Sequence, residues 1–171
     1  TVCAPESISA VKAAATRHYG AEVITFKSRE QADLAAAEMG KADDCYWIPP
    51  YAHEDIICGQ GTAALEAFEQ VDNINALFAP CGGGGLLSGS LISARAVSPE
   101  TRVIGVEPLN ANDVASSLKA GEIQRLPQSP DTLADGAATM ATYPLNFHYL
   151  QQLDEFYEVD ESAIAYWTQW L

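Results

Sequence analysis

Four consecutive glycines, Gly82 to Gly85, constrain the fold of this chain more than any other feature of its sequence. They stand between the apolar stretch "INALFAP" and the helix-like stretch "LLSGSLISARAV". Each glycine weakens regular structure by about 0.5–1 kcal/mol relative to alanine. A run of four therefore predicts that the backbone approaches a ligand closely, with its N–H groups turned toward an anion. The alternative is a flexible or tightly turned connection.

Strand-like and helix-like stretches alternate along most of the chain. Strands are expected at 1–5, 21–26, 74–80, 101–108 and 156–159, with a short one at 45–51, and helices at 6–20, 28–40, 59–71, 86–97, 112–121, 145–153 and from 160. This alternation predicts βαβ units around a parallel sheet, and hence the α/β class. The pair Pro49–Pro50 indicates a domain boundary, which divides the chain into 1–52 and 53–171.

Charge and cysteine content narrow the classes of partner and compartment. The sequence has 23 acidic and 9 basic residues, a net charge of −14, which disfavours nucleic acid and anionic membranes as partners. A small anion stays compatible, because one local pocket can oppose the overall field. No apolar run is long enough to predict a membrane span, and no signal peptide is visible at the start. The four cysteines form no CxxC pair and predict a reduced, cytoplasmic compartment.

Three kinds of anion site could use such a glycine run. A Walker loop is excluded, because no GK[ST] follows the glycines. A dinucleotide site needs GxGxxG, but its third glycine would fall on Leu87 or on Ser88. Glu107 nevertheless ends the next expected strand, where an acid that binds ribose could lie. A dinucleotide-binding module is therefore one alternative, and a phosphate-binding loop for a smaller cofactor is the other.

Five segments, in order along the chain, resemble the pyridoxal-phosphate-dependent family of serine/threonine dehydratases and serine racemases. They read "KAAATRHYGAEVI", "IPPYAHEDIICGQGTAALE", "CGGGGLLSG", "VIGVEPLNANDV" and "TLADGAA". The resemblance implies a fold like that of the tryptophan-synthase-β-type enzymes, with residues 1–52 in the small domain and 53–171 in the large domain. It implies removal of ammonia from a 3-hydroxy amino acid to give a 2-oxo acid, with racemisation as the alternative reaction. It also implies a homodimer.

The resemblance also implies roles for particular residues. The backbone N–H groups of Gly82, Gly83, Gly84, Gly85 and Leu86 would hold the cofactor's phosphate, and Gly136 would lie beside its pyridine ring. Glu107, the carbonyl of Ala111 and Asp113 match the divalent-cation site of metal-binding members, and such oxygen ligands suit Mg²⁺ or Ca²⁺. Alternatively, Glu107 is a solvated acid at a strand end and Asp113 caps a helix.

The lysine that forms a Schiff base with the cofactor in this family has no counterpart here. None of the lysines stands in a matching motif; they are Lys12, Lys27, Lys41 and Lys119. We therefore expect the chain to be part of a longer enzyme and to be inactive by itself. A non-catalytic phosphate-binding or dinucleotide-binding α/β domain is the alternative.

Several other residues have less specific expectations. Cys81 is expected to be a small packed residue, because nothing nearby would activate its thiolate. His53 is expected in the connection between domains, and Gln60 and Thr62 at a helix start. The tryptophans are expected in a core or an interface; they are Trp47, Trp167 and Trp170.

Overall fold

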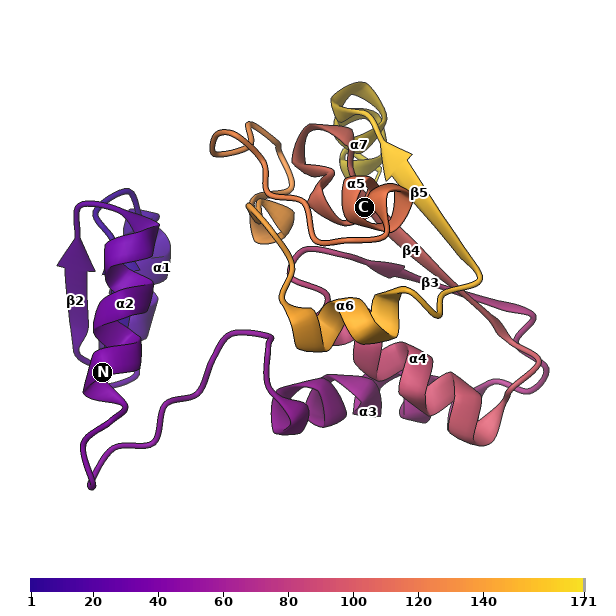
Figure 1. Ribbon diagram of the computed structural model, residues 1–171, viewed down its shortest axis with the longest axis horizontal. Coiled ribbons are helices and arrows are strands. Elements are labelled where there is room, and N and C mark those ends of the chain that lie inside the picture. Colours follow the sequence, from indigo (N-terminus) through magenta and orange to yellow (C-terminus); the bar gives the residue numbers. More distant parts are fainter. Residues whose placement is uncertain (171) are drawn as a thin grey trace. The chain divides into compact units, whose positions relative to one another are not determined.

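The structure, a computed structural model, describes residues 1–170 and divides into two compact units, one of residues 1–48 and one from Pro49 onward. The first unit is a two-stranded parallel sheet with two helices (Figure 1). Its elements are β1 (Val2–Pro5), α1 (Ala10–His18), β2 (Val23–Phe26) and α2 (Arg29–Met39). The α2 helix begins where the Ser28 hydroxyl accepts the N–H of Gln31, as a capping serine does. The small buried core of the first unit consists of Ala4, Ala13 and Ala32.

The second unit contains a three-stranded parallel sheet in the order β3-β4-β5. Its helices and strands are α3 (Glu54–Gln70), β3 (Ala76–Pro80), α4 (Gly85–Val97), β4 (Arg102–Pro108), α5 (Asp113–Ala120), α6 (Pro144–Leu150), β5 (Glu155–Val159) and α7 (Glu161–Thr168). Two 3₁₀ turns, η1 (Leu109–Ala111) and η2 (Asp135–Ala137), complete it. Since β3, β4 and β5 are parallel, their carboxyl ends share one edge of the sheet, where ligands bind in such folds.

Helices α3 and α4 lie side by side in the second unit (Figure 1). Gly61 and Gly89 allow this close approach: a β-carbon on Gly89 would lie 2.5 Å from the backbone nitrogen of Gly61. Leu87 and Leu91 on α4 pack with Val103 on β4 and Leu150 on α6 in the hydrophobic core. This packing fixes the start of α4, and so the glycine loop, against the end of the sheet.

The connection between the units differs from the sequence prediction. Residues 45–49 form no strand, because two successive prolines lack the N–H groups that a sheet ladder needs. Helix α3 starts at Glu54 rather than at 59, since Nδ1 of His53 accepts the N–H of Asp55 and two acids occupy the first turn. Gln60 and Thr62 consequently lie inside a helix and do not start one. Whether the units correspond to the small and large domains of the family stays a prediction.

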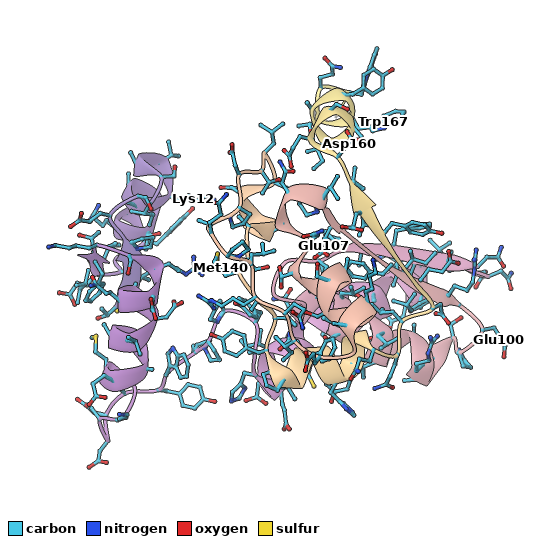
Figure 2. All side chains as sticks on the ribbon, turned by 45° about the horizontal axis from the view of Figure 1, so that its top comes forward. Lys12, Glu100, Glu107, Met140, Asp160 and Trp167 are labelled. Atoms are coloured by element: carbon cyan, nitrogen blue, oxygen red, sulfur yellow. The ribbon has the colours of Figure 1, made fainter. Side chains whose placement is uncertain are left out.

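The three tryptophans lie at the surface and not in a core. Trp47 is 45% exposed, Trp167 65% and Trp170 69%. Figure 2 shows Trp167 projecting from α7, a helix with no buried residue. The expectation of a core position was therefore wrong, and an interface role stays a prediction. Within the described residues, no helix has the length and apolar character needed to cross a membrane.

Candidate cofactor site

The glycine run forms the turn between β3 and α4, at the carboxyl end of β3. Gly84 is the residue before the helix and has a φ of +92°, a left-handed conformation that glycine adopts without strain. Within the described part of the chain, the N–H groups of Gly82 to Leu86 have no backbone or side-chain acceptor. Five free donors at the positive end of a 13-residue helix are the kind of groups that bind anions in proteins. The loop lies where the sequence predicts it, between a strand and a helix, and its binding of a phosphate stays a prediction.

Neighbouring groups lie close to the loop and leave little room for side chains there, least of all at Gly83. A β-carbon on Gly82 would lie 3.1 Å from Cα of Ala137 and 3.1 Å from the carbonyl oxygen of Gly136. A β-carbon on Gly83 would overlap the ring of Tyr51. The structure thus brings Gly136, on η2, close to the glycine loop. A β-carbon on Gly136 itself meets nothing within 4 Å, so a role beside the pyridine ring stays a prediction.

Three residues that the sequence does not mark as functional hold the loop in place. The buried hydroxyl of Thr142 donates to the carbonyl oxygen of Gly83 at 3.2 Å. Nδ2 of Asn146 donates to the carbonyl oxygen of Tyr51 at 3.2 Å. The ring of Tyr51 also lies edge-on to that of Tyr143, with 5.6 Å between centroids. These residues come from separate segments, and no local motif marks them.

Glu107 and Asp113 form a pair of buried acids beside the loop. Glu107 ends β4 and is 2% exposed, while Asp113 begins α5 and is 0% exposed, so Glu107 is not a solvated acid at the strand end. Oε1 of Glu107 accepts the N–H of Ala115 at 2.7 Å, and Oδ1 of Asp113 accepts the hydroxyl of Thr139 at 3.0 Å. The second oxygen of each carboxylate, Oε2 and Oδ2, is buried without a partner in the described residues.

The environment of this pair raises both pKa values. Burial raises the pKa of Glu107 to about 8, although the hydrogen bond from the N–H of Ala115 lowers it. The nearby charge of Asp113 adds to the rise. Burial raises the pKa of Asp113 to about 6, although the Thr139 hydroxyl acts in the opposite direction. Two adjacent buried carboxyls with unpartnered oxygens are groups that a divalent cation would satisfy.

The predicted cation site combines these acids with the carbonyl of Ala111, which lies buried on η1. The described residues contain no group of three or more His, Cys, Asp or Glu side chains that could hold a metal ion. A cation here would therefore take two carboxylate oxygens, main-chain oxygen and water, a donor set that Mg²⁺ and Ca²⁺ accept. Asn112 does not contribute an acid, and its Nδ2 donates to Oε1 of Glu158 at 2.7 Å.

Cys81 and the lysines contribute no nucleophile to this site. Cys81 is 1% exposed, and burial together with the charges of Glu107 and Asp113 raises the pKa of its thiol well above the usual value. It is therefore the inert packed residue that the sequence predicts. The side chains of the lysines are exposed, unlike a lysine held against a cofactor; they are Lys12, Lys27, Lys41 and Lys119.

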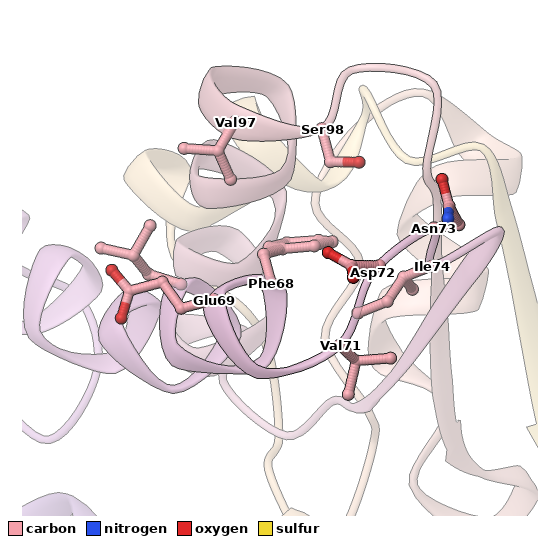
Figure 3. A pocket seen from close by; sticks show the side chains of 9 residues that line it. Phe68, Glu69, Val71, Asp72, Asn73, Ile74, Val97 and Ser98 are labelled. Atoms are coloured by element: carbon pink, nitrogen blue, oxygen red, sulfur yellow. The ribbon is translucent and has the colours of Figure 1, made fainter.

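Figure 3 shows a separate cavity of about 280 Å³ at the other end of β3 and α4. Its walls include Phe68, Val71 and Val97, with Glu69 and Asp72 as the charged residues. Two acids and an apolar wall disfavour an anion. The glycine loop, and not this cavity, is therefore the candidate site for a phosphate.

Residues 1–171 match the protein family described as "Pyridoxal-phosphate dependent enzyme". The chain belongs to this family. Enzymes of the pyridoxal-phosphate dependent family use pyridoxal phosphate, and the glycine loop is a site that fits its phosphate group. The carboxylate of Glu107 is bound to the N–H of Ala115 inside the protein, so it does not face outward as a ribose-binding acid. Glu107 therefore does not support the alternative of a dinucleotide-binding module.

Known members similar to this chain include both lyases and racemases. L-threo-3-hydroxyaspartate ammonia-lyase of Saccharomyces cerevisiae is 42% identical over 171 residues, which cover 96% of this chain and 51% of that protein. Serine racemase of Dictyostelium discoideum is 41% identical over 149 residues, covering 84% of this chain and 46% of that protein. The chain thus spans about half the length of the curated relatives that it matches.

Solved structures of the pyridoxal-phosphate dependent family confirm the predicted fold class. Maize serine racemase superposes with a TM-score of 0.88 at 34% identity, over 94% of this chain and 49% of the maize chain. The parallel sheet and its βαβ order are therefore those of serine racemases and threonine deaminases.

Proposed function

We propose that this chain forms the phosphate-binding part of an enzyme that removes ammonia from a 3-hydroxy amino acid and yields a 2-oxo acid. The observation that carries the proposal is the row of five unpartnered N–H groups on Gly82 to Leu86, in a glycine loop at the end of a parallel strand. The ammonia-lyases among the relatives support the reaction, and the serine racemases support racemisation as the second candidate.

The loop's own groups account for binding and orientation. Backbone N–H groups bind a phosphate without a basic side chain, and the dipole of α4 favours its negative charge. The segment at Gly136 and Ala137 packs against Gly82, so it would border a cofactor held by the loop. Pyridoxal phosphate, when bound, supplies an electron sink that stabilises the negative charge left by loss of the substrate's α-proton. The chain's contribution is to hold the cofactor by its phosphate.

The remaining parts of the proposal concern the cation and the catalytic lysine. We propose that Glu107, Asp113 and the carbonyl of Ala111 bind Mg²⁺ or Ca²⁺, supported by the two unpartnered carboxylate oxygens. We also propose that the cofactor-binding lysine lies on a segment outside residues 1–171, supported by the exposure of the lysines within them. The homodimer, the cytoplasmic location and the assignment of 1–52 and 53–171 to two domains stay predictions.

The first experiment identifies the lysine in the longer protein that contains this chain. The protein is incubated with pyridoxal phosphate and reduced with borohydride, and the tagged lysine is located by peptide mass spectrometry. We expect one tag, on a lysine outside residues 1–171. A tag confined to Lys12, Lys27, Lys41 or Lys119, or no specific tag, would contradict the proposed function.

The second experiment separates lyase from racemase. The native protein and, as a control, the borohydride-reduced protein are each given L-serine, L-threonine or L-threo-3-hydroxyaspartate. Release of ammonia with the corresponding 2-oxo acid is expected from at least one of them with the native protein alone. Formation of the D-enantiomer without ammonia would instead establish racemisation.

A further inference from the structure

Asn146 contacts the glycine loop from α6 and is completely buried. Its Nδ2 donates to the carbonyl oxygen of Tyr51 at 3.2 Å. Its Cβ lies 3.4 Å, and its Nδ2 3.6 Å, from the position that a β-carbon would take on Gly84. One side chain thus binds the segment before α3 and packs against the loop that starts α4.

The two partners of Asn146 control most of the loop. The ring of Tyr51 covers the face of Gly83, and its carbonyl oxygen lies 3.2 Å from where a β-carbon on Gly85 would stand. Gly84, whose missing β-carbon would meet Asn146, carries the left-handed φ of +92° that turns the chain into the helix. Fixing Tyr51 and Gly84 together therefore restricts Gly83, Gly84 and Gly85, whose N–H groups have no acceptor in the described residues.

The amide of Asn146 has one unused group at this position. A carbonyl oxygen accepts only, so the nitrogen of the amide must face Tyr51 and the oxygen must face elsewhere. That oxygen, Oδ1, is buried without a partner in the described residues. Buried acceptors are almost always satisfied in folded proteins. Asn146 therefore holds Tyr51 through its donor alone, and its oxygen, an acceptor, would not bond to a phosphate, which also accepts.

We propose that Asn146 is the positioning residue of the phosphate loop: it sets the directions of the loop N–H groups through Tyr51 and Gly84. The inference rests on the proposed function, because it needs a phosphate group in the loop. It deepens that function by assigning the loop's geometry to a residue more than 50 positions away in the sequence from the glycines it supports. Asn146 acts through its neighbours and is not a catalytic residue.

The test uses the longer protein and compares Asn146→Asp and Asn146→Ala with wild type. Asp has the size of Asn but lacks the donor for Tyr51 and adds negative charge beside the loop. Thr101→Val is the control, since it removes a buried hydroxyl that donates to the carbonyl oxygen of Ile74 before the starts of β3 and β4, away from the loop. The readouts are the Kd of pyridoxal phosphate, the ³¹P NMR shift of the bound phosphate, and the Tm of each protein.

We expect Asn146→Asp to weaken binding of pyridoxal phosphate about tenfold or more, with Asn146→Ala intermediate, because a carbonyl is left unpaired. Both variants should move the ³¹P signal. Thr101→Val should lower Tm, because the carbonyl of Ile74 is left unpaired, and should leave the Kd and the ³¹P shift of the folded protein unchanged. If Asn146→Asp does not fold, Asn146→Ala carries the test with the same readouts.

Two results would overturn the inference, and the binding of pyridoxal phosphate to wild type distinguishes them. If wild type binds pyridoxal phosphate and both Asn146 variants bind it with the wild-type Kd and ³¹P shift, Asn146 is only a structural residue. If wild type itself binds no pyridoxal phosphate, the proposed function fails, and the inference fails with it. A lower Tm with unchanged phosphate signals also counts against positioning.

Discussion

The hydroxyl of Thr139 donates a hydrogen bond to Oδ1 of Asp113 at 3.0 Å, and so joins the predicted cation site to the segment that carries Gly136. This bond lowers the pKa of Asp113, opposing the rise caused by burial. It leaves Oδ2 of Asp113 as the free oxygen of the carboxylate. Thr139 therefore favours the charged form of the acid and orients it.

Thr139→Val should weaken binding of Mg²⁺ or Ca²⁺ at pH 7. Without the hydroxyl, the pKa of Asp113 rises further, so a proton competes better with the cation. A hydrogen bond of this kind corresponds to about 3- to 10-fold in the Kd. Isothermal titration calorimetry measures the Kd, and Thr139→Ser, which keeps the hydroxyl, should bind as wild type does. Equal affinity of the Val variant would show that Thr139 does not tune the site.

The raised pKa of Glu107 should make stability depend on pH when no cation is present. Its pKa is about 8 in the folded protein against 4.5 for an ordinary glutamate, so the folded state holds the proton more tightly. The stabilisation is complete below pH 4.5 and is lost as the pH rises toward 8. The free energy of unfolding should fall by on the order of 1 kcal/mol per pH unit between about pH 5 and 8.

Thermal unfolding in EDTA across this pH range provides the measurement, with Glu107→Gln as the comparison. The Gln variant cannot ionise, so its stability should vary much less with pH than that of wild type. Added Mg²⁺ or Ca²⁺ should restore the thermal stability of the wild-type protein at pH 8, because the cation binds the ionised form of Glu107. If wild type and Glu107→Gln show the same pH slope, another group causes it.

The local part of the site was predictable from the sequence, because local chemistry determines it. A glycine run after an apolar stretch requires a loop with unusual backbone angles, and Gly84 has one. The helix expected from residue 160 is α7, which begins where the carboxylate of Asp160 accepts the N–H of Ala163. Such features depend on residues within a few positions of one another.

The residues that support the loop could not be found in this way. Tyr51, Thr142 and Asn146 reach the loop from segments far apart in the sequence, and each is an ordinary residue in its own segment. Burial of Glu107 also depends on the packing of whole elements. For this reason the sequence could not exclude that Glu107 is a solvated acid at the end of a strand. By contrast, the start of α3 had a usable signal, because Glu54 and Asp55 are acids of the kind that favour a first helical turn.

Gly83→Ala should destabilise the protein because the new methyl group would overlap the ring of Tyr51. Overpacking of this kind costs about 1–3 kcal/mol. Tyr51→Ala in the same molecule removes the ring, so the double variant should lose less stability than the sum of the two single variants by about 1 kcal/mol. Chemical denaturation of the four proteins gives this coupling energy. Additive losses would mean that the ring does not press on Gly83.

Two helical glycines allow a matched test of the contact between α3 and α4. Gly59 faces open space, so Gly59→Ala should stabilise α3 by about 0.5–1 kcal/mol through helix propensity alone. Gly89 is also helical, but its β-carbon would lie 2.5 Å from the backbone nitrogen of Gly61, and backbone cannot rotate away as a side chain can. Gly89→Ala should therefore lower the free energy of unfolding by about 2 kcal/mol or more, despite the same gain in helix propensity.

Because α4 starts at the glycine loop, Gly89→Ala should also weaken phosphate binding, which Gly59→Ala should leave unchanged. Urea unfolding and pyridoxal phosphate titration of the two variants check both parts, and stabilisation by Gly89→Ala would show that the helices are not held in this close contact.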